Sequence, residues 1–345
     1  MRAFQLTAAQ TTELREVPEP QPGPGEVLVQ VGAAGACHSD LHLMQAPAEA
    51  LSAFPVPFTL GHENAGWVHA LGAGVGGFEQ GEPVAIYGIL ACGRCRACLA
   101  GRDNECRNVP PSGIGIGRDG GMAPFLSVPA RQLIPIGDLD VAQAAPLTDA
   151  GLTPYHAIAI NRDALTPGST CVVIGIGGLG HMAIQILAAT TAARIIAVDV
   201  EQRHLALARD IGAHETVRSG GQAQAEIRDL VGPAPGGADV VLDFVCLDET
   251  LALGAAVVST GGRLTLVGLG GGTLPLQVGI APTIPFQVSL EIPFWGTRAE
   301  LAEVIALARA GLIFAHIERF SLTDARTAYE RLEHGEIDGR AVVVP

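Results

Sequence analysis

The sequence predicts an α/β protein in which a β-rich region precedes a doubly wound parallel-sheet domain. At 345 residues the chain exceeds the roughly 250–300 residues over which one hydrophobic core keeps growing, so two domains are expected. Glycine and proline interrupt the first 150 residues and leave only short apolar runs. From about residue 168, strand-like and helix-like segments alternate, an order that is typical of a parallel sheet covered by helices on both faces.

Residues 1–150 are expected to form the first, β-rich domain. The segments PEPQPGPGE (18–26) and GAGVGGFEQGEPV (72–84) separate its apolar runs. The strand candidates are the runs VLVQV (27–31), AGWVHAL (65–71) and PVAIYG (83–88).

Residues 151–288 are expected to form the parallel-sheet domain. Its strand candidates are CVVIG (171–175), IIAVD (195–199), ADVVLDFV (238–245), GRLTLVG (262–268) and QVSLEI (287–292), the last of which runs past the boundary. Helices are expected over 178–192 and 202–213. In the first of them apolar residues recur with helical spacing and should bury one face: Leu179, Met182, Ala183, Ile186 and Leu187.

Residues 289–345 are expected to return to the first domain. This tail contains two helical patterns, at 299–311 and around 324–335, and a final strand, RAVVVP (340–345). It is too small to form a domain of its own, which is why it should complete the first one.

Composition and charge exclude several classes of function. A net charge of −14 argues against nucleic acid or an anionic membrane as a partner. All 21 basic residues are arginine, so a Schiff-base lysine and a Walker A phosphate loop are both excluded. No apolar run reaches the ~18–20 residues of a membrane-spanning helix, and the first residues lack a signal-peptide core. A cytoplasmic protein is therefore expected.

Four of the seven cysteines lie close together in the pattern C-x2-C-x2-C-x7-C. Four thiolates so arranged suit a tetrahedral zinc ion with no open coordination position, which would hold a loop of about residues 90–108 in place. Disulfides are the alternative, but a cysteine cluster in a reducing compartment favours metal. The predicted ligands of this structural zinc are Cys92, Cys95, Cys98 and Cys106.

A glycine-rich loop, GIGGLG (175–180), follows the first strand of the second domain. Its glycines Gly175, Gly177 and Gly180 match G-x-G-x-x-G, which permits a tight turn and close approach of a pyrophosphate to the start of the next helix. Asp199 ends the following strand, where it would accept hydrogen bonds from both hydroxyls of the adenosine ribose and repel a 2′-phosphate. The loop therefore favours NAD over NADP. The alternative is a glycine turn in a domain that binds no cofactor.

A second metal site is indicated by the segments CHSDLH (37–42) and GHE (61–63). Cys37 and His62 offer one thiolate and one imidazole, a mixed ligand set that suits a catalytic zinc. The residues alone leave another interpretation open, because a buried cysteine is often a small apolar residue and a lone histidine is often structural.

Taken together, these motifs resemble the zinc-dependent alcohol dehydrogenases of the medium-chain dehydrogenase/reductase superfamily. The resemblance runs essentially from end to end, with CHSD, GHE, the cysteine pattern, GIGGLG with its aspartate and the closing GRAVVVP in family order. Through LTDAGLTPYHA (147–157) and PFWGTR (293–298) the chain most resembles bacterial NAD-dependent secondary alcohol dehydrogenases. The resemblance implies a GroES-like catalytic domain, a Rossmann domain and a homodimer or homotetramer, with QVSLEIPFW (287–295) as an interface edge.

The resemblance also implies roles for residues around the second metal. Cys37 and His62 become catalytic zinc ligands, and Asp149 becomes the third ligand, at a position where many relatives have cysteine. The alternative for Asp149 is a helix N-cap. Glu63 is expected near the metal as a supporting or transient ligand, and Asp40 is expected to orient His62 through its other ring nitrogen.

The substrate site is implied in the same way. Ser39 would hydrogen-bond the substrate oxygen and begin a proton relay through the nicotinamide ribose that ends at His42, unless His42 is merely exposed. Phe54, Phe294 and Trp295 would wall an apolar substrate pocket, although on pattern alone such aromatics are more often core residues.

For the cofactor, the resemblance adds Arg340 as a pyrophosphate contact, with a surface arginine as the alternative. His204 stands where relatives often have Arg or Lys against the adenosine ribose. The full set of expected cofactor-binding residues is Gly175, Gly177, Gly178, Leu179, Gly180, Asp199, His204, Phe244, Val267 and Arg340.

The function predicted from sequence is therefore reversible hydride transfer between an apolar secondary alcohol or its ketone and NAD(H), with two zinc ions per chain. Two alternatives stay open: a zinc- and NAD-dependent dehydrogenase of primary alcohols, polyols or amino-alcohols, and a non-catalytic protein that only binds the cofactor.

Overall fold

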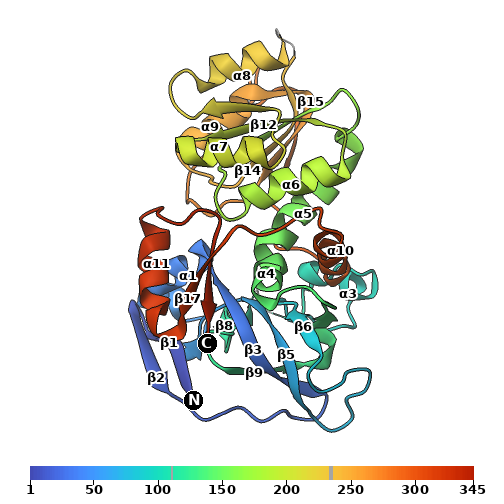
Figure 1. Ribbon diagram of the computed structural model, residues 1–345. Helices are drawn as coiled ribbons and strands as arrows, with labels where there is room; N and C mark the ends of the chain where they lie inside the picture. Colours follow the sequence, from blue (N-terminus) through green and yellow to red (C-terminus); the bar gives the residue numbers. More distant parts are fainter. Residues whose placement is uncertain (110–111, 233–235) are drawn as a thin grey trace. The chain divides into compact units, whose positions relative to one another are not determined.

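The computed structural model describes residues 1–109, 112–232 and 236–345 (Figure 1). The chain separates into two compact units. Unit 1 contains residues 1–152 and 296–345, and unit 2 contains residues 153–295. Within the described ranges, none of the helices is both long and apolar enough to cross a membrane. The functional assignment of the domains 1–150, 151–288 and 289–345 stays a prediction.

Unit 1 is built around a seven-stranded sheet of order β10-β6-β5-β3-β18-β17, with β9 paired to β3 off this path. These strands are β3 (Glu26–Ala36), β5 (Glu63–Leu71), β6 (Pro83–Ile86), β9 (Phe125–Pro129), β10 (Leu133–Pro135), β17 (Ile317–Ser321) and β18 (Arg340–Val344). A three-stranded sheet, β2-β1-β4, comprises β1 (Arg2–Ala8), β2 (Thr11–Glu16) and β4 (Phe58–Thr59). The remaining pair is β7 (Gly113–Ile114) with β8 (Gly117–Arg118).

The helical segments of unit 1 lie between these strands. They are α1 (His38–Gln45), α2 (Ala48–Leu51), α3 (Arg96–Leu99), α4 (Val141–Pro146), α10 (Arg298–Arg309) and α11 (Ala325–Glu333), with the short turns η1 (Asp103–Glu105), η2 (Ala130–Gln132), η3 (Leu147–Gly151) and η5 (Leu322–Asp324). Figure 1 shows α11, from the end of the chain, beside α1, from its beginning. One buried cluster joins β1, α1, α11 and β18, and a second lies among β3, β5, β6 and β9.

The last strand, β18, pairs antiparallel with β3, so Ala341 lies opposite Ala36 and Val343 opposite Ala34. Both strands are mostly apolar: β18 carries RAVVV, in which Arg340 is the one charged residue, and β3 carries EVLVQVGAAGA with most of its residues buried. A strand that is covered on both faces reads as a continuous apolar run, which is the pattern found here. Residues 296–345 are therefore an integral part of unit 1, whereas residues 289–295 of the expected tail belong to unit 2.

Unit 2 is a parallel six-stranded sheet of order β13-β12-β11-β14-β15-β16. Its strands are β11 (Thr170–Ile174), β12 (Arg194–Asp199), β13 (Glu215–Arg218), β14 (Ala238–Asp243), β15 (Val258–Leu266) and β16 (Ser289–Glu291). Its helices are α5 (Leu152–Ala159), which begins at the unit boundary, the turn η4 (Arg162–Ala164), α6 (Gly180–Thr190), α7 (Gln202–Asp210), α8 (Ala223–Val231) and α9 (Asp248–Val257). The predicted fold class, with a β-rich domain and a doubly wound parallel sheet, is confirmed.

The structure differs from the sequence-based expectation at two elements of unit 2. Strand β13 is not among the expected runs, because its four residues, ETVR, contain a single fully buried side chain. Helix α6 was expected to bury one face, but every residue from Gly180 to Leu187 is buried. A mostly apolar helix that is buried on several sides is typical of the interior of a layered protein, and the first two turns of α6 are of this kind.

The order of the strands reverses next to β11, since β12 lies on one side of it and β14 on the other. In open α/β sheets, ligands bind at the carboxyl ends of the strands at such a switch point. The loop 175–180 follows β11 directly, and Asp199 is the last residue of β12. The fold of unit 2 therefore brings the predicted cofactor loop and Asp199 to the same edge of the sheet.

Candidate metal centres and cofactor loop

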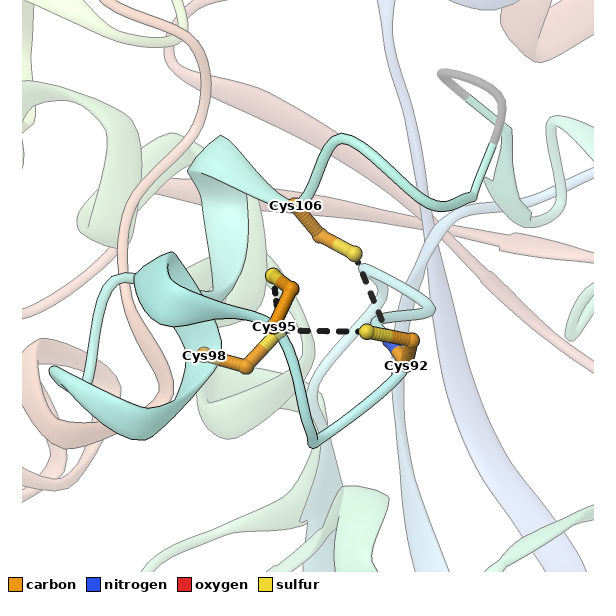
Figure 2. Close-up of side chains that lie close together, drawn as sticks. All are labelled: Cys92, Cys95, Cys98 and Cys106. Carbon is orange, nitrogen blue, oxygen red and sulfur yellow. Dashed lines mark hydrogen bonds between the residues drawn. The ribbon is translucent and has the colours of Figure 1, made fainter.

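The four clustered cysteines converge on one point (Figure 2). The sulfur of Cys98 lies 3.4 Å from that of Cys95 and 3.9 Å from that of Cys92, and the backbone N–H of Cys92 donates to the sulfur of Cys106 at 3.4 Å. Zinc–sulfur bonds of about 2.3 Å at tetrahedral angles give sulfur–sulfur separations of about 3.8 Å. All seven cysteines lie in the described ranges and are free, so the disulfide alternative is wrong.

Electrostatics at this cluster call for a cation. The backbone N–H of Arg94 lowers the pKa of Cys92 to about 6. Partial burial and the sulfur of Cys95 raise the pKa of Cys98 to about 12. Four adjacent sulfurs cannot all ionise unaided, because each new thiolate repels the others. A dication at their centre removes this conflict, so the donor set fits a closed structural zinc.

A second group of metal-binding type, buried in unit 1, consists of Cys37, His62 and Asp149. The carboxylate oxygen Oδ2 of Asp149 lies 3.7 Å from the sulfur of Cys37 and 3.4 Å from Nε2 of His62. Zinc bonds of about 2.0–2.3 Å at tetrahedral angles give edges of about 3.6 Å for sulfur and oxygen and about 3.4 Å for nitrogen and oxygen. The three donors therefore form one face of a zinc tetrahedron, with the fourth position left to a non-protein ligand.

Asp149 lies in η3, a π-helical segment that follows α4 directly. Its alternative interpretation as a helix N-cap is wrong, because Asp149 lies inside η3, which begins at Leu147 and continues directly into α5 at Leu152. Pro146 ends α4 and has no N–H to continue the α-helical hydrogen-bond pattern, and the wider turn begins just after it. Single π-helical turns occur frequently at functional sites.

Asp40 connects two of the three donors. It is fully buried on α1, and its Oδ1 lies 2.9 Å from Nδ1 of His62. Since a carboxylate only accepts hydrogen bonds, Nδ1 carries the proton and Nε2 keeps its lone pair for a metal. The other oxygen, Oδ2, accepts the backbone N–H of Cys37 at 3.0 Å. One carboxylate thus orients both the histidine and the start of the helix that carries the cysteine.

The field at His62 is negative. Burial alone lowers the pKa of His62, but the Asp40 carboxylate and hydrogen bonds to Asp149 and Asp40 raise it well above its usual range. The same negative field would also favour a metal cation at Nε2. The donor chemistry therefore fits zinc here as well.

Glu63 and Arg340 form a buried ion pair next to this group. Arg340 donates from Nε and Nη2 to the two oxygens of Glu63 at 2.8 and 2.7 Å, and its Nη2 lies 3.5 Å from Oδ2 of Asp149. Glu63 also accepts the backbone N–H of Ala150 at 2.9 Å. The surface alternative for Arg340 is wrong, since only 1% of the residue is exposed. Its contact with a pyrophosphate stays a prediction.

The strand order β5-β3-β18 explains this pair. Glu63 lies opposite Gly35 on one side of β3, and β18, which begins with Arg340, lies on the other side. A Cβ atom at position 35 would lie 1.8 Å from Oε2 of Glu63. Glycine at this position therefore lets the ion pair cross the strand.

The other residues expected at the catalytic site lie nearby in unit 1 or at its surface. The hydroxyl of Ser39 lies 3.6 Å from the sulfur of Cys37. His42 is exposed in the last turn of α1. Phe54 is partly buried and packs against the cluster that joins β1, α1 and α11. Their roles in the relay and the pocket stay predictions.

In unit 2 the glycine loop has the geometry that its motif requires. Gly175 has a φ of +86°, a left-handed conformation that favours glycine, and a Cβ at Gly180 would lie 1.8 Å from the carbonyl oxygen of Gly175. A Cβ at Gly177 would meet nothing within 4 Å. The first and third glycines are thus needed for the turn and for helix packing, and the second leaves space beside the backbone.

Asp199 is already well supplied with hydrogen-bond donors. Its Oδ2 accepts the N–H of Ile176 at 2.6 Å, and its Oδ1 accepts the N–H of Glu201 at 2.9 Å and lies 3.1 Å from Nδ1 of His204. Burial alone raises the pKa of Asp199, but these hydrogen bonds, first that of His204, lower it below its usual range. The carboxylate is therefore ionised and fixed at the end of β12, with His204 beside it.

The remaining predicted residues of unit 2 lie at or after the ends of strands. Phe244 follows β14 and Val267 follows β15, at the same edge of the sheet as Asp199. Phe294 is half exposed, and its ring meets that of the buried Trp295 edge to face, with 6.1 Å between centroids.

One residue that sequence reasoning missed is Tyr329. Its hydroxyl donates to Oδ2 of Asp40 at 2.9 Å, and the residue is 1% exposed. Local spacing carries no signal for it, because Tyr329 is one of several apolar positions on the amphipathic helix α11. Gly35 was missed as well, because its role depends on its cross-strand partner and not on the residues next to it in the sequence.

Comparison with known proteins agrees with this arrangement. The family model described as "Alcohol dehydrogenase GroES-like domain" matches residues 23–138, and the one described as "Zinc-binding dehydrogenase" matches residues 178–310. An NAD-dependent alcohol dehydrogenase from Sulfurisphaera tokodaii is 34% identical, and the match covers 100% of both chains. The chain therefore belongs to the zinc-dependent alcohol dehydrogenases of the medium-chain dehydrogenase/reductase superfamily.

Solved structures are similar over the same length. The alcohol dehydrogenase from Aeropyrum pernix has a TM-score of 0.92 at 34% identity and covers 100% of both chains. The acetophenone reductase from Geotrichum candidum, solved with NAD, has a TM-score of 0.83 at 31% identity and covers 100% of this chain and 97% of its own.

The cysteine lobe generates the first prediction. Replacing Cys95 with alanine removes one of four thiolates, and we expect it to release one zinc ion per chain and to lower the melting temperature. Cys171→Ala is the matched control, because Cys171 is buried in β11 and belongs to neither donor group. Zinc content measured on the purified variants checks this. Equal zinc in Cys95→Ala and the wild type would contradict a structural zinc in the lobe.

Proposed function

We propose that the protein is a zinc- and NAD-dependent alcohol dehydrogenase that transfers hydride reversibly between a secondary alcohol and its ketone. The observation that carries this proposal is the buried group of Cys37, His62 and Asp149, which supplies three donors and leaves the fourth metal position to substrate. Closed structural sites have four protein ligands, whereas catalytic zinc sites have three. The names of the relatives support the same reaction class.

Each side chain of the site would have its own chemical role. Cys37 and Asp149 contribute two negative charges to the metal, and His62 contributes the lone pair of Nε2 while Asp40 holds the proton at Nδ1. Zinc bound there supplies Lewis-acid chemistry at the oxygen of the alcohol or ketone. The hydroxyl oxygen of Ser39 would accept the proton of the alcohol while its own proton passes through the nicotinamide ribose to His42, which is exposed at the end of α1 and would release a proton to water.

In the proposed division of domains, residues 1–150 and 289–345 are catalytic and residues 151–288 bind the cofactor. The G-x-G-x-x-G turn binds the pyrophosphate, which Arg340 contacts as well, and Asp199 selects NAD. Three donors already contact Asp199, so a ribose hydroxyl must take a remaining lone pair or displace the imidazole of His204. Phe244 and Val267 lie where the cofactor would extend along the strand ends.

The proposed substrates are apolar alkyl or aryl secondary alcohols. Phe54, Phe294 and Trp295 would provide an apolar wall, which binds hydrocarbon substituents and offers nothing to a polyol or an amino-alcohol. The name of the relative that reduces acetophenone, an aryl ketone, supports this class.

The free cysteines of both donor groups fit a reducing compartment, so we propose a cytoplasmic location.

We also propose that the protein is a homodimer or homotetramer. Strand β16 lies at the edge of its sheet, where unpaired backbone groups are available to another strand. The residues around it include a series of exposed apolar side chains: Leu276, Val278, Ile280, Phe286, Leu290, Ile292 and Phe294. Exposed apolar patches of this kind mark interfaces.

The reaction is tested with a panel of substrates and two variants of Asp149, one that keeps its negative charge and one that removes it. The wild type should oxidise secondary alcohols with a higher kcat/KM than primary alcohols or polyols. Asp149→Cys keeps the negative charge and should keep zinc and turnover within about tenfold, whereas Asp149→Asn should lose metal affinity and activity by about 10–100-fold. Turnover by a metal-free wild type, or by Asp149→Asn with unchanged zinc, would contradict the proposal. A preference for polyols would favour the alternative substrates, and absence of turnover with any alcohol would favour a non-catalytic protein.

Cofactor choice is tested at Asp199. Asp199→Ala removes the carboxylate that accepts a ribose hydroxyl, so kcat/KM with NAD should fall by about 10–100-fold. The ratio of activity with NADP to activity with NAD should rise, because the 2′-phosphate is no longer repelled. Glu201→Gln is the control: it removes an exposed charge two residues away and should leave the ratio unchanged. A wild type that uses both cofactors equally would refute the role of Asp199.

The oligomer is tested at Ile292, whose side chain is 74% exposed. Ile292→Asp places a charge in the apolar series and should shift the protein toward monomers in sedimentation or light scattering. Leu312→Asp, at an exposed leucine of unit 1 outside that series, should not. Dissociation in both variants or in neither would count against an interface at β16.

A further inference from the structure

The Asp40 carboxylate has three donors, and they come from three separate parts of unit 1. Nδ1 of His62 lies 2.9 Å from Oδ1, while Oδ2 accepts the backbone N–H of Cys37 at 3.0 Å and the hydroxyl of Tyr329 at 2.9 Å. Asp40 is fully buried, so each of these hydrogen bonds replaces one that water would otherwise make. Loss of any one of them changes how the carboxylate is held.

Tyr329 is itself held rigidly. It lies on α11 and is 1% exposed, and its ring stacks on that of Phe4 from β1 with 5.9 Å between centroids and 21° between planes. Burial and the nearby Asp40 carboxylate raise the pKa of the phenol well above its usual range, so the hydroxyl keeps its proton and acts as a donor. A hydrogen bond from a neutral hydroxyl to a carboxylate is charge-assisted and stronger than one between neutral groups.

We propose that Tyr329 is a positioning residue of the catalytic metal centre, whose hydroxyl fixes the Asp40 carboxylate and, through it, His62 and Cys37. This inference rests on the proposed function, since it requires zinc at Cys37, His62 and Asp149. The hydroxyl of Tyr329 donates to Asp40, and we expect it to act on the metal donors through that carboxylate. Groups that orient metal ligands in this way change metal affinity or activity by about 10–100-fold when they are removed.

The geometry shows why the hydroxyl matters more than the ring. In its absence Oδ2 keeps one donor, the N–H of Cys37, and the buried carboxylate can rotate toward other partners. Rotation lengthens the contact of Oδ1 with Nδ1 of His62 and frees the imidazole to turn away from the metal. Tyr329 also lines a surface cavity of about 330 Å³ with Leu41 and Met44, so a much smaller side chain would enlarge this cavity as well as remove the hydroxyl. Phenylalanine removes the hydroxyl and keeps this wall.

The test compares two tyrosine-to-phenylalanine variants of the zinc-loaded enzyme. Tyr329→Phe should release the zinc of the Cys37 group to a chelator at least tenfold faster than the wild type. The kcat for a secondary alcohol should fall by about tenfold, with the KM for NAD unchanged. Tyr87→Phe is the matched control, because Tyr87 is also 1% exposed and its hydroxyl donates to the backbone oxygen of Gly296 at 2.8 Å. It should change neither zinc release nor kcat.

A double-mutant cycle shows whether Tyr329 acts through Asp40. On the Asp40→Asn background, Tyr329→Phe should change zinc release by less than about twofold, because the group that it orients is already gone. Full additivity of the two changes would overturn the proposal, as would a Tyr329→Phe enzyme with the zinc release and kcat of the wild type. A lower melting temperature with unchanged zinc release would reduce Tyr329 to a structural role and overturn it as well.

If the proposed function is wrong, the measurements on the wild type will show it, independently of the tyrosine variants. In that case the wild type itself would hold no zinc at Cys37, His62 and Asp149, or would oxidise no alcohol. The wild-type zinc content and turnover are therefore measured first, and the comparison of the tyrosine variants is read against them.

Discussion

The buried ion pair between Arg340 and Glu63 is the interaction on which the rest of unit 1 depends. Arg340 is the one buried arginine among the residues that the structure describes, and it contacts carboxylates on two sides, Glu63 and Asp149. A buried charge without a partner is strongly destabilising. The pair therefore requires β5, which carries Glu63, and β18, which carries Arg340, to be in register with β3 between them. The pairing of β18 with β3 meets this requirement and joins the end of the chain to its beginning.

The buried acids around this ion pair outnumber the one arginine, so the group of Cys37, His62 and Asp149 lies in an excess of negative charge. Asp40, Glu63 and Asp149 are buried acids, the thiol of Cys37 lies among them, and a single arginine opposes them. A buried anion is stable only when a cation or several hydrogen bonds offset its desolvation. Asp40 has its hydrogen bonds, and Glu63 has Arg340. A dication held by Cys37, His62 and Asp149 would balance the remaining charge and would make the metal part of the folded core.

The parts of this arrangement that were predictable from sequence are short and local. The four cysteines lie within 15 consecutive positions (92–106), and the glycine loop and Asp199 are spaced as a strand, a helix and a strand require. The zinc-binding dehydrogenase class predicted from these motifs is confirmed. Strand β13 escaped prediction because its residues alternate too weakly. The alternatives for Asp149 and Arg340 were wrong because N-capping and exposure depend on packing, which a local pattern does not contain.

By itself, the sequence determined the class of protein, and it predicted the two kinds of metal donor set and the preference for NAD, because each depends on residue types at short spacing or on motifs in a fixed order. Only the tertiary structure decided how the catalytic group is supported. Gly35 makes room for the side chain of Glu63, and Tyr329 contacts Asp40 from 289 positions away, and no pattern along the chain relates these residues. The physical reason is register: the antiparallel order β5-β3-β18 and the packing of α11 decide which side chains meet, and both follow from the fold as a whole.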